Sequence, residues 1–406
     1  MAAVAALALW MATGCAKSED FDYDAVEQAS LDEWMSRNEP DAQKLENGMY
    51  MKKLGGGEPD GAVAEYGNWL FIDYTYTDLS GNVVGTRYEQ TARRQGTYTP
   101  YTHYTPDYVY FYDPDKISTG VQIMVDGQHQ ALIGMREGES VRAWLPSSLA
   151  YGGSGYANTV GYGGEATLPA SVPMVIRELK LLEVVKDPVD REEKLVKEYA
   201  ARELGLPETD TLAANLYLKV TERHPEGAKI AEDSTVNIYY TGRFLDGFVF
   251  ETNIDTVQWR LYGQMYDNSV MSYKASNDTG IGAWYKVIPT MRYGESGIMV
   301  FTSEWGYGLG KGAARLNADS DDTSNYTNSL LYNPYYGYGG YGGYGYSDYT
   351  NMYYNSLYYQ QLYDSYLNTA YSSRNDESDE NIVLSTEVLP YTPLVYEFYI
   401  QPYKEK

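Results

Sequence analysis

An internal repeat constrains the fold of this 406-residue chain more than any other feature. Three short blocks recur in the same order, namely 134–139 with 290–295, 150–152 with 306–308, and 168–175 with 389–395. The spacing of the first two blocks is the same in both copies, which a chance match does not explain. The chain is also too long for one typical hydrophobic core. The sequence therefore predicts two domains that are copies of one fold.

The composition excludes several classes of function. The formal net charge of −25 disfavours binding to the phosphates of nucleic acid. His103, His129 and His224 lack the spacing of metal ligands and the chain has one cysteine, so we expect no metal site and no other cofactor. No apolar stretch is long enough to span a membrane. The sequence predicts an exposed protein whose charge keeps it dispersed.

The N-terminus has the features of a bacterial lipoprotein signal. Residues 1–14 are small and apolar, and Ala12-Thr13-Gly14 precede Cys15. Such a cysteine is lipidated and becomes the new N-terminus, which would anchor the chain to a membrane. Neither Lys nor Arg precedes the apolar run, so we expect the true start to lie upstream. We expect an outer-membrane lipoprotein of the cell envelope that faces the periplasm or the cell surface.

Changes in composition divide the rest of the chain. The expected segments are a signal peptide (1–15), a tether (16–46), a first domain (47–187), a linker helix (188–206) and a second domain (207–403) with a Tyr/Gly-rich insertion at about 325–373. Within the tether, 16–28 are expected to be flexible and 29–45 to form one or two helical turns interrupted by Pro40. The linker helix is expected to end at Gly205 and Pro207.

The most informative segment of the second domain is 234–253, STVNIYYTGRFLDGFVFETN. An alternating strand ends at Tyr240-Thr241-Gly242, and a turn around Asp246-Gly247 leads to Phe250-Glu251. The pattern predicts an antiparallel hairpin that directs the rings of Tyr240 and Phe250 at one pocket. Strand-like patterns occur in both halves, separated by the linker helix, and the expected fold class is α+β.

This hairpin resembles the signature of FKBP-type peptidyl-prolyl isomerases. In that family a short antiparallel sheet curls around one helix and forms an aromatic pocket for a substrate proline. The resemblance covers nearly the whole second domain, and it includes Gly280-Ile281-Gly282-Ala283-Trp284, which is similar to the family's V-I-x-G-W element. Because of the internal repeat, the resemblance implies two FKBP-like domains, each a curled antiparallel sheet around a short helix.

The resemblance implies a role for each matched residue. The expected catalytic residues are Tyr240, Phe250, Glu251, Ile281, Trp284 and Tyr307. Ile281 would supply a backbone N–H to a substrate carbonyl, Trp284 would form the pocket floor, and the Tyr307 hydroxyl would face the substrate. The remaining apolar wall would be formed by Leu389 and Tyr396. Two positions depart from the family, since Glu251 stands in place of the usual Asp and Gly280 replaces an apolar residue.

The first domain departs further from the family. Tyr74 and Tyr151 match the two pocket tyrosines and are expected to contact substrate, but Gln128 stands where Trp is expected. Val84 and Gly85 stand in place of the pocket Phe and the acid. Losing both rings removes most of the apolar grip on a proline. We expect this domain to be FKBP-like in fold and weak or inactive as an isomerase, so that it binds chain segments or spaces the second domain from the membrane.

The reaction that the resemblance implies needs no nucleophile, metal or general base. Rotation about an X–Pro bond meets a resonance barrier of about 18–20 kcal/mol, which a pocket lowers when it desolvates the amide and favours the twisted geometry. The sequence thus predicts an enzyme, a peptidyl-prolyl cis-trans isomerase that acts on unfolded or proline-containing polypeptides and assists the folding of exported or surface proteins.

Two alternatives to this enzyme remain open. One is a non-catalytic FKBP-like chaperone or protein-binding module at the cell envelope, in which both pockets only hold polypeptide. The other is a surface interaction protein that acts through its Tyr/Gly-rich insertion. That insertion lies between Tyr307 and Leu389, where the family has a loop overhanging the pocket, so contact with bound polypeptide is a further expectation for it.

Overall fold

The computed structural model describes residues 22–100, 102–114, 124–158, 166–231, 234–263, 270–274, 281–307 and 388–402. Cys15, Gly280 and the Tyr/Gly-rich insertion lie outside these residues, so what the sequence predicts for them stays a prediction. In the described part of the chain, no helix combines the length and the apolar character that crossing a bilayer requires.

Short helices are interspersed among the strands. The α-helices are α1 (Tyr23–Asn38), α2 (Glu89–Gln95), α3 (Asp126–Leu132), α4 (Pro188–Tyr199), α5 (Asp255–Tyr262) and α6 (Gly282–Val287). The 3-10 helices are Ser147–Leu149, Gly152–Ser154, Ile288–Thr290 and Ser303–Trp305, and a π-helical turn, Ala200–Leu204, follows α4. The first strands are β1 (Gln43–Lys44), β2 (Tyr50–Gly55), β3 (Trp69–Thr77), β4 (Val83–Thr86), β5 (Asp107–Tyr110), β6 (Ser140–Leu145), β7 (Tyr156–Asn158), β8 (Ala166–Leu168) and β9 (Met174–Val185). The later strands are β10 (Leu216–Glu222), β11 (Thr235–Phe244), β12 (Val249–Thr252), β13 (Met271–Lys274), β14 (Ser296–Phe301) and β15 (Leu394–Ile400).

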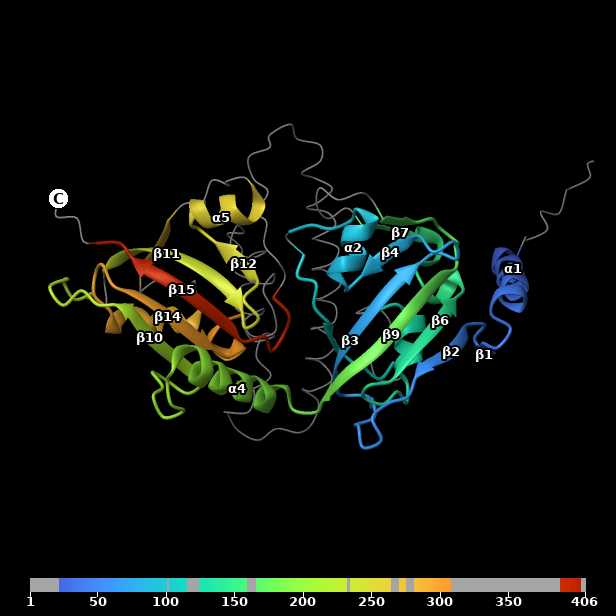
Figure 1. Cartoon of the computed structure of the whole chain (residues 1–406), viewed down its shortest axis with the longest axis horizontal. Helices are drawn as coiled ribbons and strands as arrows, with labels where there is room; N and C mark the ends of the chain where they lie inside the picture. The colour runs from blue at the N-terminus through green and yellow to red at the C-terminus, as the bar shows by residue number, and fades with distance from the viewer. Residues whose placement is uncertain are drawn as a thin grey trace, which may run out of the picture.

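Within the described residues, the strands form two large antiparallel sheets with the same internal order. The first sheet runs β1-β2-β6-β9-β3-β4, with β5 paired to β3, and the second runs β10-β14-β15-β11-β12, with β13 paired to β11. Strands β7 and β8 pair separately. We call α1 to β9 the first unit and α4 to β15 the second unit (Figure 1). The predicted repeat is therefore a repeat of strand topology.

The repeat extends to single hydrogen bonds. In the first sheet the hydroxyls of Thr75 and Thr86 lie 2.9 Å apart, and in the second those of Thr241 and Thr252 also lie 2.9 Å apart. These threonines sit opposite each other on paired strands, β3 with β4 and β11 with β12. The pairs fix which residues of the two units are equivalent.

Each sheet has its own hydrophobic core, and a short helix contributes to each. In the first unit, Ala131 and Leu132 of α3 are buried among residues of the first sheet. In the second unit, Ala283, Trp284 and Val287 of α6 are buried among residues of the second sheet. A helix this short is marginal in isolation, so its stability derives from packing its apolar face on the sheet.

The helix α1 begins earlier than the sequence predicts. It starts at Tyr23, not near residue 29, because the carboxylate of Asp22 accepts a hydrogen bond of 3.0 Å from the backbone N–H of Ala25 and caps the helix. It ends at Asn38, two residues before Pro40. Residues 23–28 are therefore helical and do not belong to a flexible tether.

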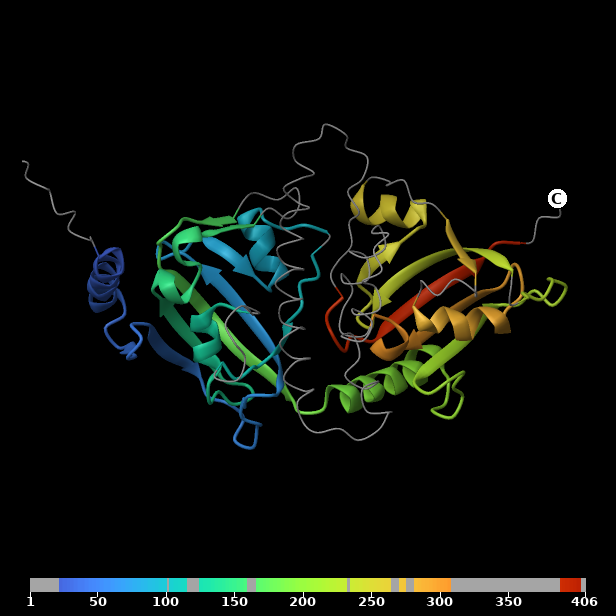
Figure 2. The ribbon, with the colours of Figure 1, turned by 180° about the vertical axis from the view of Figure 1, so that it is seen from behind.

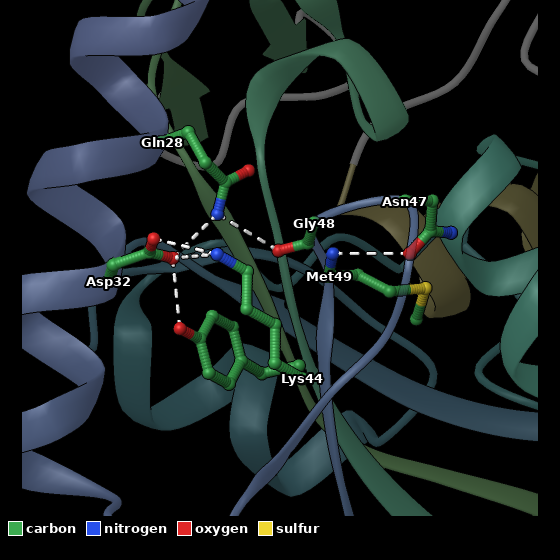
Figure 3. Close-up of polar contacts among 7 residues, drawn as sticks. Gln28, Asp32, Lys44, Asn47, Gly48 and Met49 are labelled. Atoms are coloured by element: carbon green, nitrogen blue, oxygen red, sulfur yellow. Dashed lines mark hydrogen bonds and ion pairs between the residues drawn. The ribbon is translucent and has the colours of Figure 1, made fainter.

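This helix is attached to the first sheet by packing and by a polar cluster. Leu31 and Met35 are fully buried against Trp144 and Val175. The carboxylate of Asp32 accepts hydrogen bonds from Lys44 Nζ, from the Tyr50 hydroxyl and from Gln28 Nε2, and Gln28 also donates to the Gly48 carbonyl (Figure 3). The cluster joins α1 to the β1–β2 region, so α1 belongs to the first unit.

The helix predicted before the second sheet is present as α4 and its π-helical turn. It ends at Gly205, whose φ of +67° is the left-handed conformation that glycine adopts readily. Its buried face and the residues it covers are Val196, Ala200, Leu204, Tyr217, Val300 and Val395. Figures 1 and 2 show α4 lying along the second sheet. It packs on that sheet as α1 packs on the first.

Candidate functional site: an aromatic cluster on the second sheet

Hydrogen bonds fix the hairpin that presents the predicted site residues. The turn predicted at Asp246-Gly247 is present, and Gly247 has a φ of +93°. Asn253 accepts the backbone N–H of Tyr240 at 2.7 Å, and the Thr241–Thr252 pair joins the two strands. These contacts hold Tyr240 on β11 in a fixed position relative to β12.

Gly242 leaves space for the ring of Phe250. Gly242 of β11 lies opposite Glu251 of β12 in the strand register. A β-carbon added at Gly242 would lie 2.7 Å from the Phe250 Cζ, closer than side-chain contacts allow. The Phe250 ring is thus fully buried against the β11 backbone.

Tyr396 of β15 is the centre of an aromatic cluster in the second unit. Its ring centroid lies 5.4 Å from that of Trp284, 5.5 Å from Tyr240 and 5.9 Å from Phe250. Trp284 and Tyr240 also meet directly, edge to face, at 6.2 Å. Edge-to-face geometry at these separations is favourable for aromatic rings. The hairpin rings predicted to share a pocket therefore meet through Tyr396.

A buried carboxylate ties the hydroxyls of the cluster together. Glu251 Oε1 accepts a hydrogen bond of 2.5 Å from the Tyr396 hydroxyl and one of 3.1 Å from the Tyr307 hydroxyl. The two hydroxyl oxygens lie 3.1 Å apart. Burial first, and the negative charge of Glu251 second, raise the pKa of both tyrosines well above their usual range. Both phenols therefore stay protonated and act as donors.

Tyr396 combines the predicted apolar contact with a polar one. The sequence assigned it to an apolar wall, and its ring does pack in the core, but its hydroxyl is the closest donor to Glu251. A buried carboxylate needs donors, and Tyr396 provides one beside Tyr307.

Ile281 and Leu389 differ in how they relate to the cluster. Ile281 precedes α6 at its N-cap position and is buried in the same core. Leu389 is half-buried and lies outside this core, whereas its neighbour Val388 belongs to it. The structure thus does not place Leu389 with the other predicted residues.

Two further rings complete the cluster and were not predicted. Phe301 of β14 stacks on Tyr396 at an interplanar angle of 11°, and Phe398 of β15 lies 5.2 Å from Trp284. The signal for Phe398 was present in the sequence, because residues two apart on a strand share a face and Tyr396 was already assigned.

At the equivalent place in the first unit, the glycine and the residue with a large side chain have changed strands. Tyr76 of β3 lies opposite Gly85 of β4, just as Gly242 lies opposite Glu251 in the second unit. In the first unit the large side chain is therefore on the earlier strand, β3, and in the second unit it is on the later strand, β12. The Tyr76 ring is buried, and its hydroxyl donates to Gln128 Oε1. The first unit has an aromatic ring at this place, which the comparison of Val84 with Phe250 did not predict.

The two predicted tyrosines of the first unit have internal partners. The Tyr74 hydroxyl donates to Asp107 at 2.5 Å, and Arg87 pairs with the same carboxylate at 3.0 Å. The Tyr74 ring stacks on Tyr76 with centroids 4.4 Å apart. Tyr151 stacks on Tyr156 with centroids 4.6 Å apart. This unit presents a hydrogen-bonded group of tyrosines in place of the tryptophan-based cluster.

The described residues were also compared with the arrangements that hold metal ions. In the ranges that the structure describes, no group of three or more His, Cys, Asp or Glu side chains is arranged to hold a metal ion.

Comparisons with known proteins give distant matches. No family model and no curated protein matches the chain. Among solved structures, the three FKBP domains of wheat FKBP73 match with 13% identity and a TM-score of 0.25, over 89% of this chain and 97% of that one. A peptidyl-prolyl cis-trans isomerase from Pseudomonas syringae pv. tomato matches with 18% identity and a TM-score of 0.27, over 40% of this chain and 95% of that one. FkpA from Escherichia coli matches with 16% identity and a TM-score of 0.28, over 40% of this chain and 61% of that one.

Proposed function

We propose that this chain is a peptidyl-prolyl cis-trans isomerase whose activity resides in the second unit. The observation that carries the proposal is the cluster in which Tyr240, Phe250, Trp284 and Tyr396 meet, with Tyr307 at its polar end. Rings of this kind suit the flat, apolar ring of a proline. A few donors beside them suit the carbonyls that flank it.

The proposed mechanism uses desolvation and orientation. Aromatic walls remove water from the X–Pro amide, and a less polar surrounding favours the twisted amide, in which resonance is lost. The Ile281 N–H would hold one carbonyl of the substrate and the Tyr307 hydroxyl another. Catalysis then follows from binding the twisted geometry more tightly than either planar form.

Glu251 would tune the Tyr307 hydroxyl. Tyr307 has one proton to donate, and in the structure that proton is directed at Glu251. A substrate carbonyl must therefore compete with the carboxylate. The shorter bond from Tyr396 eases the competition because it already supplies Glu251 with a donor. The Glu251–Tyr396 pair would thus let the Tyr307 hydroxyl turn from Glu251 to the substrate.

For the first unit we propose a non-catalytic role, in which it holds polypeptide or spaces the second unit from the membrane. The supporting observation is that the Tyr74 and Tyr76 hydroxyls are both engaged, with Asp107 and Gln128 respectively. Polar partners at the place of the pocket floor weaken the apolar grip that proline binding needs. The chaperone alternative extends this role to both units.

The proposal is tested by the rate of cis-trans exchange of a short X–Pro peptide with the full chain. Uncatalysed exchange takes tens to hundreds of seconds, so an acceleration proportional to protein concentration is readily measured. We expect such an acceleration. An unchanged exchange rate, together with binding of unfolded protein, would support the chaperone alternative.

We also propose that the protein assists the folding of exported or surface proteins from a lipid anchor at Cys15. The support is the apolar segment and small residues before that cysteine. In a host that processes lipoproteins, Cys15→Ser is expected to move the protein from the membrane fraction to the soluble fraction. Continued membrane association of the variant would contradict the anchor.

A further inference from the structure

The two units share a hydrogen-bonded link between their first helix and a serine. In the second unit, Glu192 of α4 accepts the backbone N–H of Ser303 and, at 2.8 Å, its hydroxyl. In the first unit, Glu27 of α1 accepts the same two groups of Ser147, both at 2.5 Å. The same contact in both units shows that the preceding helix is part of each repeat.

The serine begins the turn that leads to the matched tyrosine. Ser303–Trp305 form a 3-10 helix, Gly306 follows with φ −113° and ψ −116°, and Tyr307 comes next. In the first unit, Ala150 has nearly the same conformation, φ −120° and ψ −111°, before Tyr151. The Trp305 indole N–H also donates to the Ala214 carbonyl at 2.7 Å. The turn is therefore held at Ser303 by Glu192 and at Trp305 by Ala214, and its conformation is nearly the same in both units.

We propose that Glu192 is a positioning residue for the site of the second unit, because its carboxylate holds the Ser303–Trp305 turn and that turn places the Tyr307 hydroxyl. This inference rests on the proposed function. Glu192 does not touch the aromatic cluster itself. It acts from α4 on the chain segment that carries Tyr307 to Glu251 and Tyr396.

The surroundings of Glu192 make this link sensitive to pH. The side chain is 3% exposed, and burial raises its pKa from 4.5 to about 7, with Glu304 and Glu193 adding to the rise and the Ser303 hydrogen bonds opposing it. From the first unit, Tyr108 of β5 also lies within electrostatic range. The ionised carboxylate accepts both Ser303 bonds, whereas the protonated carboxyl has lost part of its acceptor capacity. The turn is therefore held most firmly above about pH 7.

The stability of the fold has the opposite pH dependence. A pKa that is raised by folding means that the folded state binds the proton more tightly than the unfolded state. The stabilisation from this group is complete below pH 4.5 and is lost as the pH rises through about 7. If Glu192 acts only through the stability of the fold, kcat is expected to be highest at low pH. If Glu192 positions Tyr307, kcat is expected to be highest above about pH 7.

The neighbour of Glu192 connects α4 to the first unit. Arg191 forms two hydrogen bonds of 2.8 Å with the Glu183 carboxylate of β9. Its guanidinium also lies 4.3 Å from the centroid of the Phe71 ring, at a cation–π distance. Adjacent residues of α4 therefore contact the two units, Arg191 the first and Glu192 the second.

The test compares matched variants of the full chain in the X–Pro exchange assay. We expect Glu192→Ala to lower kcat by about tenfold with little change in KM, since a misplaced hydroxyl weakens transition-state contacts more than substrate binding. Glu192→Gln keeps a carbonyl acceptor for the Ser303 N–H and is expected to recover most of kcat, with no step in the pH profile near 7. Glu27→Ala, which removes the equivalent carboxylate in the first unit, is expected to leave kcat unchanged.

A second measurement does not depend on catalysis. The amide proton resonance of Ser303 and the ring resonances of Tyr307 are expected to shift together between about pH 6 and 8 in the wild-type chain, and to stay constant in Glu192→Gln. Constant resonances in the wild type would overturn the inference, and so would equal losses of kcat in Glu192→Ala and Glu27→Ala. If the wild-type chain does not catalyse exchange, the proposed function fails, and the resonances alone decide whether Glu192 positions Tyr307.

Discussion

Trp284→Ala is expected to lower the free energy of unfolding of the second unit by about 3–5 kcal/mol, the range for removing a large buried ring. Trp284 is 3% exposed, and its ring meets those of Tyr240, Tyr396 and Phe398. Removing it leaves a cavity on the face of α6 that packs against the sheet. Urea unfolding of the full chain, followed by tyrosine fluorescence, measures the loss as a shift in the transition of this unit.

Gln128→Ala is the matched control, since Gln128 of α3 is the equivalent residue of the first unit and is equally buried. It removes a smaller side chain and one hydrogen bond to Tyr76, so its expected cost is only about 1–2 kcal/mol. Equal losses in the free energy of unfolding for the two variants would contradict the view that only the second unit depends on a buried ring at this position. Trp284→Phe, which keeps a ring, is expected to recover part of the stability.

Glu251→Ala is expected to destabilise the second unit by about 2–4 kcal/mol, because it removes the carboxylate that accepts hydrogen bonds from both the Tyr307 and the Tyr396 hydroxyl. The same variant is expected to lower the isomerisation rate, because Tyr307 loses the group that orients it. The free energy of unfolding and kcat, measured on the same preparations, report the two effects separately.

Tyr396→Phe provides the control for this prediction. Combined with Glu251→Ala, it removes one of the two hydroxyls that have lost Glu251 as their acceptor, and the double variant is expected to be more stable than Glu251→Ala alone. The difference from additivity measures the coupling between the two side chains. Strict additivity would contradict the hydrogen-bonded network.

Most residues of the aromatic cluster in the second unit could be predicted from the sequence, because they lie in short motifs of fixed spacing. Tyr240, Phe250 and Trp284 fall on a hairpin and on the start of a helix, where strand alternation and helix spacing place the rings. Leu389 was misplaced because it precedes β15, where no strand alternation fixes a side chain. Tyr396 was assigned by its ring alone, although a buried acid nearby requires donors.

Features that depend on distant partners were not predictable in this way. Tyr76 occupies the position on β3 that Gly242 occupies on β11. The consequence for the site becomes apparent only when β3 is paired with β4, because Tyr76 then lies opposite Gly85. The Glu192–Ser303 link joins residues 111 positions apart, and nothing in the local pattern of α4 indicates it. Position in three dimensions decides these contacts, not spacing in sequence.

In the proposed mechanism, the aromatic cluster of the second unit catalyses proline isomerisation through the Tyr307 hydroxyl. The most direct measurement is the exchange rate of an X–Pro peptide with the wild-type chain, with Tyr307→Phe, and with Tyr217→Phe, which alters a buried tyrosine of the same unit outside the cluster. We expect clear acceleration by the wild type and by Tyr217→Phe, and a loss of about tenfold or more in Tyr307→Phe, the scale of one hydrogen bond made in the transition state. A wild-type rate equal to the uncatalysed one, or an undiminished rate in Tyr307→Phe, would contradict the claim.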